Sequence, residues 1–429
     1  MSVTNVPKAA SIAKSGRRSR LLLAFLCVAA LVSGGRTWWT YHRFQGAMEE
    51  IESAIVAGQY AIACRNLENL LSWRADPTGE IAYLLGSCEL SRGRKQAAGK
   101  AWARVAPGSA FTERAIEGRM NVLLGSGQLA AAERLVIDAA LDSRNDRTAL
   151  LVLLVPTYTD LGRMDDAKRL IEDRWEYLNT RGEGALEPGI KLVLEHIELS
   201  FIAKPVEIVR DFLERASQLA PDDDRVWLGL ANLAIRTGAF DEAKRWLDAC
   251  QPSRPEDVAV WRARLNWGLA TNRVDVVKQA MKHVPALESN SGQFHRQNAW
   301  LAAQREDLAT ERGELELLVA ADPEDVTALD RLALLAAKEG QPTRVAELRR
   351  RKADVEGRLT RYRELRDRKQ PFRDAVEFAQ LAQQLGRNFE ARVFLTIAIS
   401  EEPARMDLRR DLERLRATPA MIAVTGPRA

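Results

Sequence analysis

The sequence has few of the residues from which catalytic and metal sites are usually built. Its 429 residues include only four histidines and four cysteines, and aromatic residues make up 6%. The histidines are scattered, and no CxxC pair or Cys/His cluster at zinc spacing occurs. The HExxH, GxxxxGK[ST], GxSxG and DxDxDG motifs of metalloproteases, phosphate loops, hydrolases and calcium loops are also missing. We therefore expect a chain that is not an enzyme and that uses no metal or other cofactor.

The cysteines and histidines that are present fit packing roles. Cys250 falls among small residues that recur on one helix face, so we expect a buried and inert thiol. His196 also falls on an apolar face, which favours a buried structural histidine over a general base. Cys64 and Cys88 belong to segments expected to form neighbouring helices, and the sequence leaves open whether they form a disulfide.

The formal net charge of +4 is unevenly distributed along the chain. Residues 1–20 contain five basic residues and no acidic ones, and Arg344–Lys369 contains eleven basic and five acidic residues. The remainder of the chain is therefore mildly acidic. Such a surface does not favour nucleic acid, and we expect no nucleic-acid partner.

An apolar run, Leu21–Val32, follows the basic residues 1–20. The 21 residues of Leu21–Tyr41 contain one interior charge, which is enough length for a spanning helix, and they end in a Trp/Tyr cluster suited to a membrane interface. A cleaved signal peptide is the alternative, with a weak cleavage site at Val32-Ser33-Gly34. We favour the uncleaved anchor. The basic flank then stays inside, which predicts a single-pass inner (cytoplasmic) membrane protein whose remaining chain is periplasmic or otherwise extracytoplasmic.

Glycine, alanine and proline recur along the chain with a period of 34 or 35 residues. Pro221 and Pro255 are 34 residues apart, and Pro323 follows after a further 68. A helical hairpin built on such a unit cannot bury both of its faces alone and needs copies of itself on either side. Gly-x4-Ala pairs, each a turn followed by a small packing residue, occur at Gly58/Ala63, Gly93/Ala98, Gly127/Ala132, Gly162/Ala167, Gly238/Ala243 and Gly386/Ala391.

The stretch Asp224–Pro255 shows the pattern most completely, as two apolar helix stripes separated by Gly238. With Asp224 counted as position 1, its packing residues are Trp227 at 4, Ala231 at 8, Phe240 at 17, Ala243 at 20, Leu247 at 24 and Pro255 at 32. This spacing resembles that of the tetratricopeptide repeat (TPR) family. The resemblance extends over roughly residues 44–416. It implies an all-α fold, a right-handed superhelical solenoid of helical hairpins, here placed behind an N-terminal transmembrane helix.

The repeat register divides the chain into segments. Asn179–Gly189 interrupts the register with three glycines and a proline, and we interpret it as a loop. The full division is a basic cytoplasmic tail at 1–20, the anchor at 21–41, repeats one to four at 44–178, the linker at 179–189, repeats five to nine at 190–342, a long basic helix at 343–369, a final repeat at 372–403, a capping helix at 404–416 and a disordered tail at 417–429.

The basic helix at 343–369 has two interpretations. Its apolar residues, among them Leu348, Val355 and Leu359, follow a 3-4 spacing that suits either a coiled-coil seam or an extended second helix packed on the last repeat. We favour the second interpretation. The coiled-coil seam would make the chain a structural protein that self-associates, and Leu359→Asp would disrupt it.

In the family that the chain resembles, positions 2, 5, 9, 12 and 13 of the first helices line a concave groove. The resemblance partly extends to the carboxylate clamp of chaperone-binding repeats, since Arg262, Asn266 and Arg331 fit three of its places, whereas Gln297 and Thr327 depart from it. A wall of Arg, Asn and Trp suits an extended peptide that carries carboxylates. The predicted groove residues are Arg225, Asn232, Arg236, Arg262, Asn266, Arg296, Trp300 and Arg331, with Leu228, Ile235 and Leu269 between them.

The resemblance implies a non-enzymatic scaffold or adaptor that binds a protein or peptide partner in this groove while tethered to the membrane. Two alternatives remain, a substrate-recruiting subunit of an envelope enzyme complex and the self-assembling structural protein. Loss of the partner on Arg262→Ala or Trp300→Ala would favour a binding groove over self-assembly.

Overall fold

The computed structural model describes residues 42–73, 75–181, 186–283 and 292–417, and these ranges are helical with no strand among them. The predicted anchor at 21–41, the basic tail before it and residues 418–429 of the predicted C-terminal tail lie outside the described residues. Within the described ranges, no helix has both the length and the apolar character that crossing a bilayer requires.

The chain divides into two compact units, Met1–Val122 and Leu123–Ala429. The first unit contains a helix over residues 42–56 and then α2 (Tyr60–Trp73), α3 (Glu80–Ser91), α4 (Lys95–Trp102) and most of α5 (Thr112–Leu124). Close packing in this unit depends on glycine, because a Cβ atom on Gly86 would lie 2.4 Å from Nε1 of Trp102. Cys64 and Cys88 are both buried in its core as free thiols.

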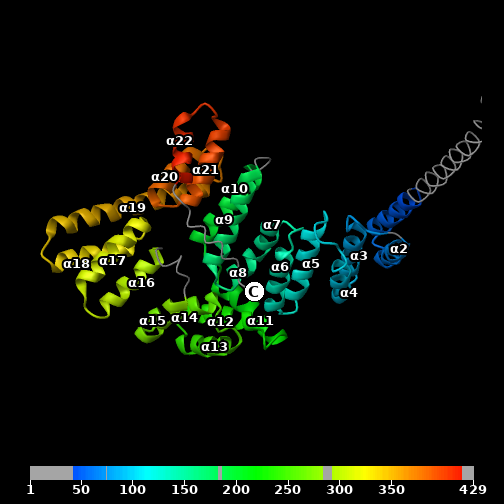
Figure 1. Ribbon diagram of the computed structural model, residues 1–429, viewed down its shortest axis with the longest axis horizontal. Coiled ribbons are helices and arrows are strands. Elements are labelled where there is room, and N and C mark those ends of the chain that lie inside the picture. The colour runs from blue at the N-terminus through cyan, green and yellow to red at the C-terminus, as the bar shows by residue number, and fades with distance from the viewer. Residues whose placement is uncertain (1–41, 74, 182–185, 284–291, 418–429) are drawn as a thin grey trace, which may run out of the picture. The chain divides into compact units, whose positions relative to one another are not determined.

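The second unit contains the remaining helices, most of which follow one another as antiparallel pairs (Figure 1). They are α6 (Leu129–Leu141), α7 (Arg147–Leu151), the 3-10 helix η1 (Val152–Leu154), α8 (Val155–Asp160), α9 (Met164–Arg181), α10 (Leu186–Phe201), α11 (Val206–Leu219), α12 (Asp224–Thr237), α13 (Phe240–Ser253), α14 (Val258–Ala270), α15 (Val274–His283), α16 (Gly292–Ala303), α17 (Leu308–Ala321), α18 (Val326–Lys338), α19 (Pro342–Arg368), α20 (Ala375–Leu385), α21 (Asn388–Glu401) and α22 (Met406–Ala417).

The hairpin α12–α13 illustrates how the repeat sequence produces its structure. Asp223 caps α12 by accepting hydrogen bonds from the backbone N–H groups of Arg225 and Val226. Gly238 ends α12 with φ of 78°, a left-handed conformation that glycine adopts without steric cost. The stripes of the two helices meet through small residues, and Cys250 is buried as predicted. The buried side chains shared by the pair are Ala231, Ala234, Ala243, Leu247 and Cys250.

The segment predicted as a loop at 179–189 is largely helical. Helix α9 continues to Arg181 and α10 begins at Leu186, which leaves only residues 182–185 outside the described structure. Pro188 lies in the first turn of α10, where its missing N–H has no helical partner to lose. Gly189 serves close packing instead of a turn, since a Cβ atom there would lie 2.1 Å from the Trp175 ring. Glycine and proline therefore misled the prediction in this segment.

Helix α10 departs from the expected pairing. One 34-residue period from the predicted start of repeat five at residue 190 ends at residue 223, and a hairpin over this range would pair α10 with α11. In the structure α10 packs on α9 and on α21, and α11 packs on α12. The four-residue connection from Ile202 to Pro205 separates α10 from α11. The two helices of the predicted repeat at 190–223 therefore do not form a hairpin with each other, and each packs on a different helix.

Helix α19 packs along its own chain. Its buried side chains lie within the unit, where α18 and α20 are its neighbours and where Tyr362 also bonds Glu390 of α21. They include Leu348, Val355 and Tyr362, which lie seven residues apart. The apolar spacing thus reflects an extended second helix. Of the residues named for a coiled-coil seam, Leu348 and Val355 are already buried and Leu359 is half-buried.

Candidate functional site

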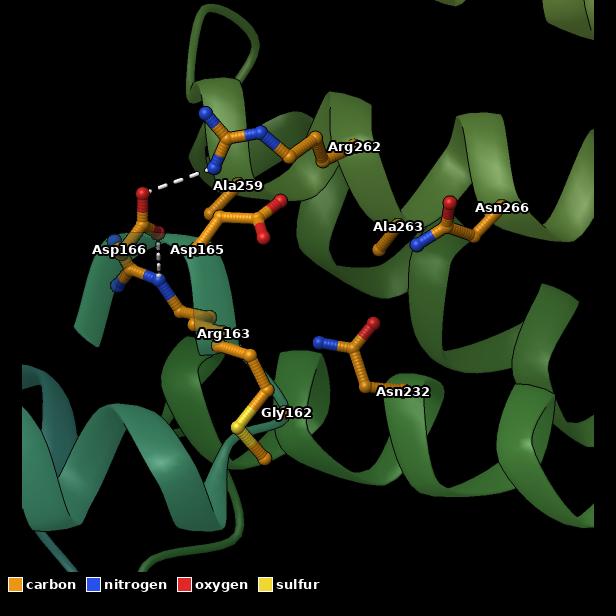
Figure 2. Close-up of a pocket in the computed structure, with 10 residues that line it drawn as sticks. Gly162, Arg163, Asp165, Asp166, Asn232, Ala259, Arg262, Ala263 and Asn266 are labelled. Atoms are coloured by element: carbon orange, nitrogen blue, oxygen red, sulfur yellow. Dashed lines mark hydrogen bonds and ion pairs between the residues drawn. The ribbon is translucent and has the colours of Figure 1, made fainter. Parts of the chain in front are cut away.

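A pocket of about 230 Å³ lies in the second unit, where the α8–α9 turn meets α12 and α14. Figure 2 shows the carboxamides of Asn232 and Asn266 directed toward the same space, with charged side chains of the turn and of α14 along the other side. Its lining residues are Gly162, Arg163, Met164, Asp165, Asp166, Asn232, Ala259, Arg262, Ala263 and Asn266. The pocket therefore brings together three of the predicted groove residues, Asn232, Arg262 and Asn266.

Contacts between backbone and side chain hold the α8–α9 turn against α12. The Asn232 carboxamide donates a hydrogen bond from Nδ2 to the backbone oxygen of Leu161 at 2.8 Å. Gly162 has φ of 72°, and a Cβ atom on it would lie 3.0 Å from the Cβ of Asn232. Glycine is required here both for the left-handed turn and for the close approach. This contact leaves the Oδ1 atom of Asn232 as the acceptor available to a ligand.

Paired charges form the opposite wall of the pocket. Arg163 donates to Asp166 at 2.7 Å and to Glu133 at 2.6 Å, and Arg262 donates to Asp166 at 2.9 Å. Burial raises the pKa of Asp166, but the charges of the two guanidinium groups outweigh burial and lower its pKa to about 2. Burial likewise raises the pKa of Glu133, and the charges of Arg225 and Arg163 outweigh it and lower that pKa. Both carboxylates remain ionised at neutral pH.

The pocket is therefore electrically balanced. Its two arginines, Arg163 and Arg262, face two aspartates, Asp165 and Asp166. Asp165 also accepts a hydrogen bond from Gln293 of α16 at 2.9 Å. A free carboxylate would gain little net attraction here, because Arg262 already bonds Asp166. The wall suits neutral hydrogen-bonding groups such as peptide amides.

Arg225 lies in a different environment from the one that the groove pattern predicted. It is 5% exposed and forms ion pairs with Glu133 of α6 and, at 2.8 Å, with Asp257 at the start of α14. These bonds join α6, α12 and α14. Because its guanidinium is enclosed by its own chain, Arg225 is placed to hold the helices together and does not line the pocket.

The other predicted residues lie outside the pocket. Arg296 pairs with Asp322 at 3.2 Å and Asp325 at 2.8 Å, and Arg331 bonds both carboxylate oxygens of Glu311. Trp300 packs against the buried cluster of α14, α15 and α16. Arg236 is exposed on α12. Of the three residues that fit the carboxylate clamp, only Arg262 and Asn266 are brought to the pocket.

The contribution of the α8–α9 turn was not predicted. The repeat pattern assigns the groove to the first helix of each repeat, whereas Arg163, Asp165 and Asp166 follow the turn glycine Gly162. The Arg-x-x-Asp spacing of Arg163 and Asp166 at a helix start was the available signal, since residues three apart on a helix are neighbours. Among the residues that the structure describes, no group of three His, Cys, Asp or Glu side chains is placed to hold a metal ion.

Solved structures with similar folds are distant from this chain. A tetratricopeptide repeat protein from Parabacteroides merdae is 12% identical, with 61% of this chain and 99% of that chain covered and a TM-score of 0.27. Yeast Tom70 is 10% identical, with 87% and 95% covered and a TM-score of 0.28. The human IFIT1 dimer with m7Gppp-AAAA is 14% identical, with 83% and 86% covered and a TM-score of 0.31. No curated protein matches the chain in sequence.

Two family models match parts of the sequence, and both describe the tetratricopeptide repeat. One covers residues 48–111 in the first unit, and the other covers residues 210–265 in the second. The second range includes α12, α13 and most of α14, which supply Asn232 and Arg262 to the pocket. The periodic glycines and alanines, the paired helices and these matches agree, and residues 48–111 and 210–265 are similar to tetratricopeptide repeats.

Proposed function

We propose that this chain is a non-catalytic scaffold that binds an extended segment of a partner protein through the pocket between the α8–α9 turn, α12 and α14. Tetratricopeptide repeats generally bind proteins or peptides. The observation that carries the proposal is the convergence of Asn232 and Asn266, at equivalent positions of consecutive repeats, on one pocket. Two carboxamides one repeat apart can each bond a peptide group of an extended chain.

The charge balance of the pocket restricts the chemical character of the segment that it can bind. Arg262 and Arg163 share Asp166, so neither guanidinium offers an uncompensated positive charge. We therefore propose a segment recognised through its main-chain amides and neutral polar side chains. This revises the expectation of a carboxylate-bearing peptide. A volume of about 230 Å³ accommodates one or two residues of such a segment, with the remainder lying outside the pocket.

Affinity capture from membranes with the full-length chain tests the proposal, with identification of the retained proteins by mass spectrometry. Asn266→Arg places a long side chain in the pocket from an exposed position, and Asn266→Ala removes one carboxamide. Arg236→Ala is the matched control, since Arg236 is exposed on α12 and does not line the pocket. A protein retained by the wild-type chain and the control but lost with both Asn266 variants supports the pocket. Equal retention by all four chains refutes it.

We further propose that residues 21–41 anchor the chain in the inner membrane, with residues 1–20 inside and the repeats on the periplasmic side. The support is the apolar run between a basic flank and an aromatic cluster. Membrane fractionation with protease protection tests this topology. Replacing Leu22 and Leu26 with arginine should release the repeats from the membrane fraction, whereas retention would contradict the anchor. A retained partner with a catalytic domain would identify the chain as a recruiting subunit.

A further inference from the structure

The last repeat of the second unit contacts a helix that lies far from it in sequence. Figure 1 shows α21 beside α10, and the two helices pack against each other. The rings of His196 and Phe389 are 4.7 Å apart, and Arg392 donates to Glu176 of α9 at 2.6 Å. The hydrogen bond between His196 and Glu390 spans 194 residues. A solenoid in which each repeat touches only its neighbours does not make such a contact.

His196 occupies the centre of this contact and is 7% exposed. Its Nδ1 atom lies 3.0 Å from a carboxylate oxygen of Glu390, and its Nε2 atom lies 3.1 Å from a carboxylate oxygen of Glu172. An ionised carboxylate only accepts hydrogen bonds, so both ring nitrogens must donate. Only the protonated, positively charged imidazole has two donors. The geometry therefore calls for a charged histidine between two carboxylates from different helices.

The surrounding groups keep Glu390 ionised. Its side chain also accepts hydrogen bonds from the Tyr362 hydroxyl and from Arg387, which in turn bonds Glu324 at 2.8 Å. Burial raises the pKa of Glu390, but the hydrogen bond from His196 and the charge of Arg387 outweigh it and lower the pKa. The charged and titratable groups around the contact are Glu172 and Glu176 of α9, Tyr362, Arg363 and Arg366 of α19, Arg387, Glu390 and Arg392 at the start of α21 and Glu324 before α18.

We propose that the contact between α10 and α21 is a pH-sensitive latch, closed while the His196 ring carries both protons and weakened when it loses one. In the neutral ring one nitrogen presents a lone pair to a carboxylate oxygen, and the attraction to Glu390 and Glu172 is lost. The Glu172 side chain is 42% exposed and can turn to water, whereas that of Glu390 is enclosed and cannot. Release of the last repeat from α10 removes tertiary packing from both helices, so the backbone amides of α10 and α21 open more readily.

The direction of the pH dependence follows from the histidine. Burial lowers the pKa of His196, but the hydrogen bonds and charges of Glu172 and Glu390 outweigh it, so the pKa lies above its ordinary value. A raised folded-state pKa gives stability that is complete below the unfolded value of about 6.5 and is lost as the pH rises through the folded value. Tyr362 does not titrate in this window, because burial and Glu390 hold its pKa well above 10. The latch therefore weakens on the alkaline side.

Hydrogen exchange of the full-length chain between pH 6 and pH 9 tests the latch. Protection of peptides from α10 and α21 is divided by that of α12–α13 in the same sample, which corrects for the intrinsic pH dependence of exchange. We expect the ratio to fall as the pH rises, by about tenfold for each unit by which the pKa of His196 exceeds its unfolded value. A ratio that stays constant across this range overturns the proposal.

Two variants separate a latch from a merely structural contact. His196→Gln cannot titrate, so its protection ratio should be low already at pH 6 and should not change with pH. Glu172→Gln removes one carboxylate at a partly exposed position where folding is not at risk, and it should reduce the pH-dependent fall while the contact persists. The same fall in His196→Gln as in the wild-type chain, or an unchanged fall in Glu172→Gln, would assign the pH dependence to other groups and refute the latch.

Discussion

The hairpins α12–α13 and α20–α21 share one repeat pattern but differ in what surrounds them. Gly238 and Gly386 end their first helices with the same φ of 78°, and Ala243 and Ala391 are both fully buried. The second helices differ on the face that a repeat normally leaves to solvent. Asp241, Glu242 and Arg245 of α13 are exposed, whereas the equivalent Phe389, Glu390 and Val393 of α21 are buried. The repeat pattern therefore specifies the hairpin, and the residues outside the pattern specify its neighbours.

The test with the largest expected effect on stability removes an aromatic side chain from the second helix of each hairpin. Phe394 of α21 is fully buried and stacks on Phe378 with a centroid separation of 4.3 Å. We expect Phe394→Ala to lower the free energy of unfolding of the second unit by about 3–5 kcal/mol. Trp246→Ala, at the equivalent half-buried position of α13, should cost about 1 kcal/mol. Urea unfolding monitored by circular dichroism gives both values, and equal costs would remove the distinction between the two hairpins.

A second test compares glutamates at the same repeat position. Glu390→Gln removes a charge that His196, Arg387 and Tyr362 all bond, and we expect a loss of about 1.5–3 kcal/mol in the local stability of α21. Glu242→Gln, at an exposed position, should change stability by no more than about 0.5 kcal/mol. Native-state hydrogen exchange measures the two hairpins separately. Similar small effects would mean that the buried charges contribute little to the stability of the contact between α10 and α21.

A third test lowers the pH, which should weaken the ion pairs of Asp166 in the pocket beside α12. The folded-state pKa of Asp166 is about 2, below the usual 3.8, so its stabilisation is present above pH 4 and is lost as the pH falls toward 2. The shift corresponds to about 2 kcal/mol. The difference in urea midpoint between the wild-type chain and Asp166→Asn should therefore shrink as the pH falls through this range. A difference that stays constant with pH would show that the carboxylate charge is not what stabilises the turn.

The smallest expected effect compares the two turn glycines. Gly238→Ala places a side chain in the left-handed region with no atom within 4 Å, and we expect a cost of about 1 kcal/mol. Gly386→Ala has the same φ, but its Cβ atom would lie 2.6 Å from Cδ of Pro323. The excess cost of Gly386→Ala over Gly238→Ala in thermal unfolding isolates this contact. Equal costs would indicate that the α17–α18 turn moves aside freely.

The sequence predicted local structure better than it predicted long-range contacts. The spacing of Gly238, Ala243 and Leu247 fixes a hairpin because each residue acts within one helical pair. The contact of His196 with Glu390 has no periodic signal, since it joins positions 194 residues apart. The sequence of α21 did contain a signal that this helix also packs outside its own hairpin. From Phe389 to Ile399 it is apolar on nearly all sides, which is typical of a helix that is buried all round.

The candidate site was predictable in part for the same reason. Asn232, Arg262 and Asn266 occupy fixed positions of their repeats, and the repeat register brings them to one pocket. Arg225 occupies another of the predicted groove positions but is buried, because α6 supplies Glu133 at that point. The position of α6 beside α12 depends on how the helices between them fold, and no spacing in the sequence encodes it.

The contact between α10 and α21 also sets an order of events during synthesis. Helix α10 leaves the ribosome long before its partner, because Glu390 follows His196 by 194 residues. At ordinary translation rates this interval lasts on the order of 10–40 s. Throughout it the apolar face of α10 that later meets Phe389 has no native cover. Such an uncovered face makes the nascent chain more prone to aggregate at this stage, whereas the hairpins that precede it can fold as they emerge.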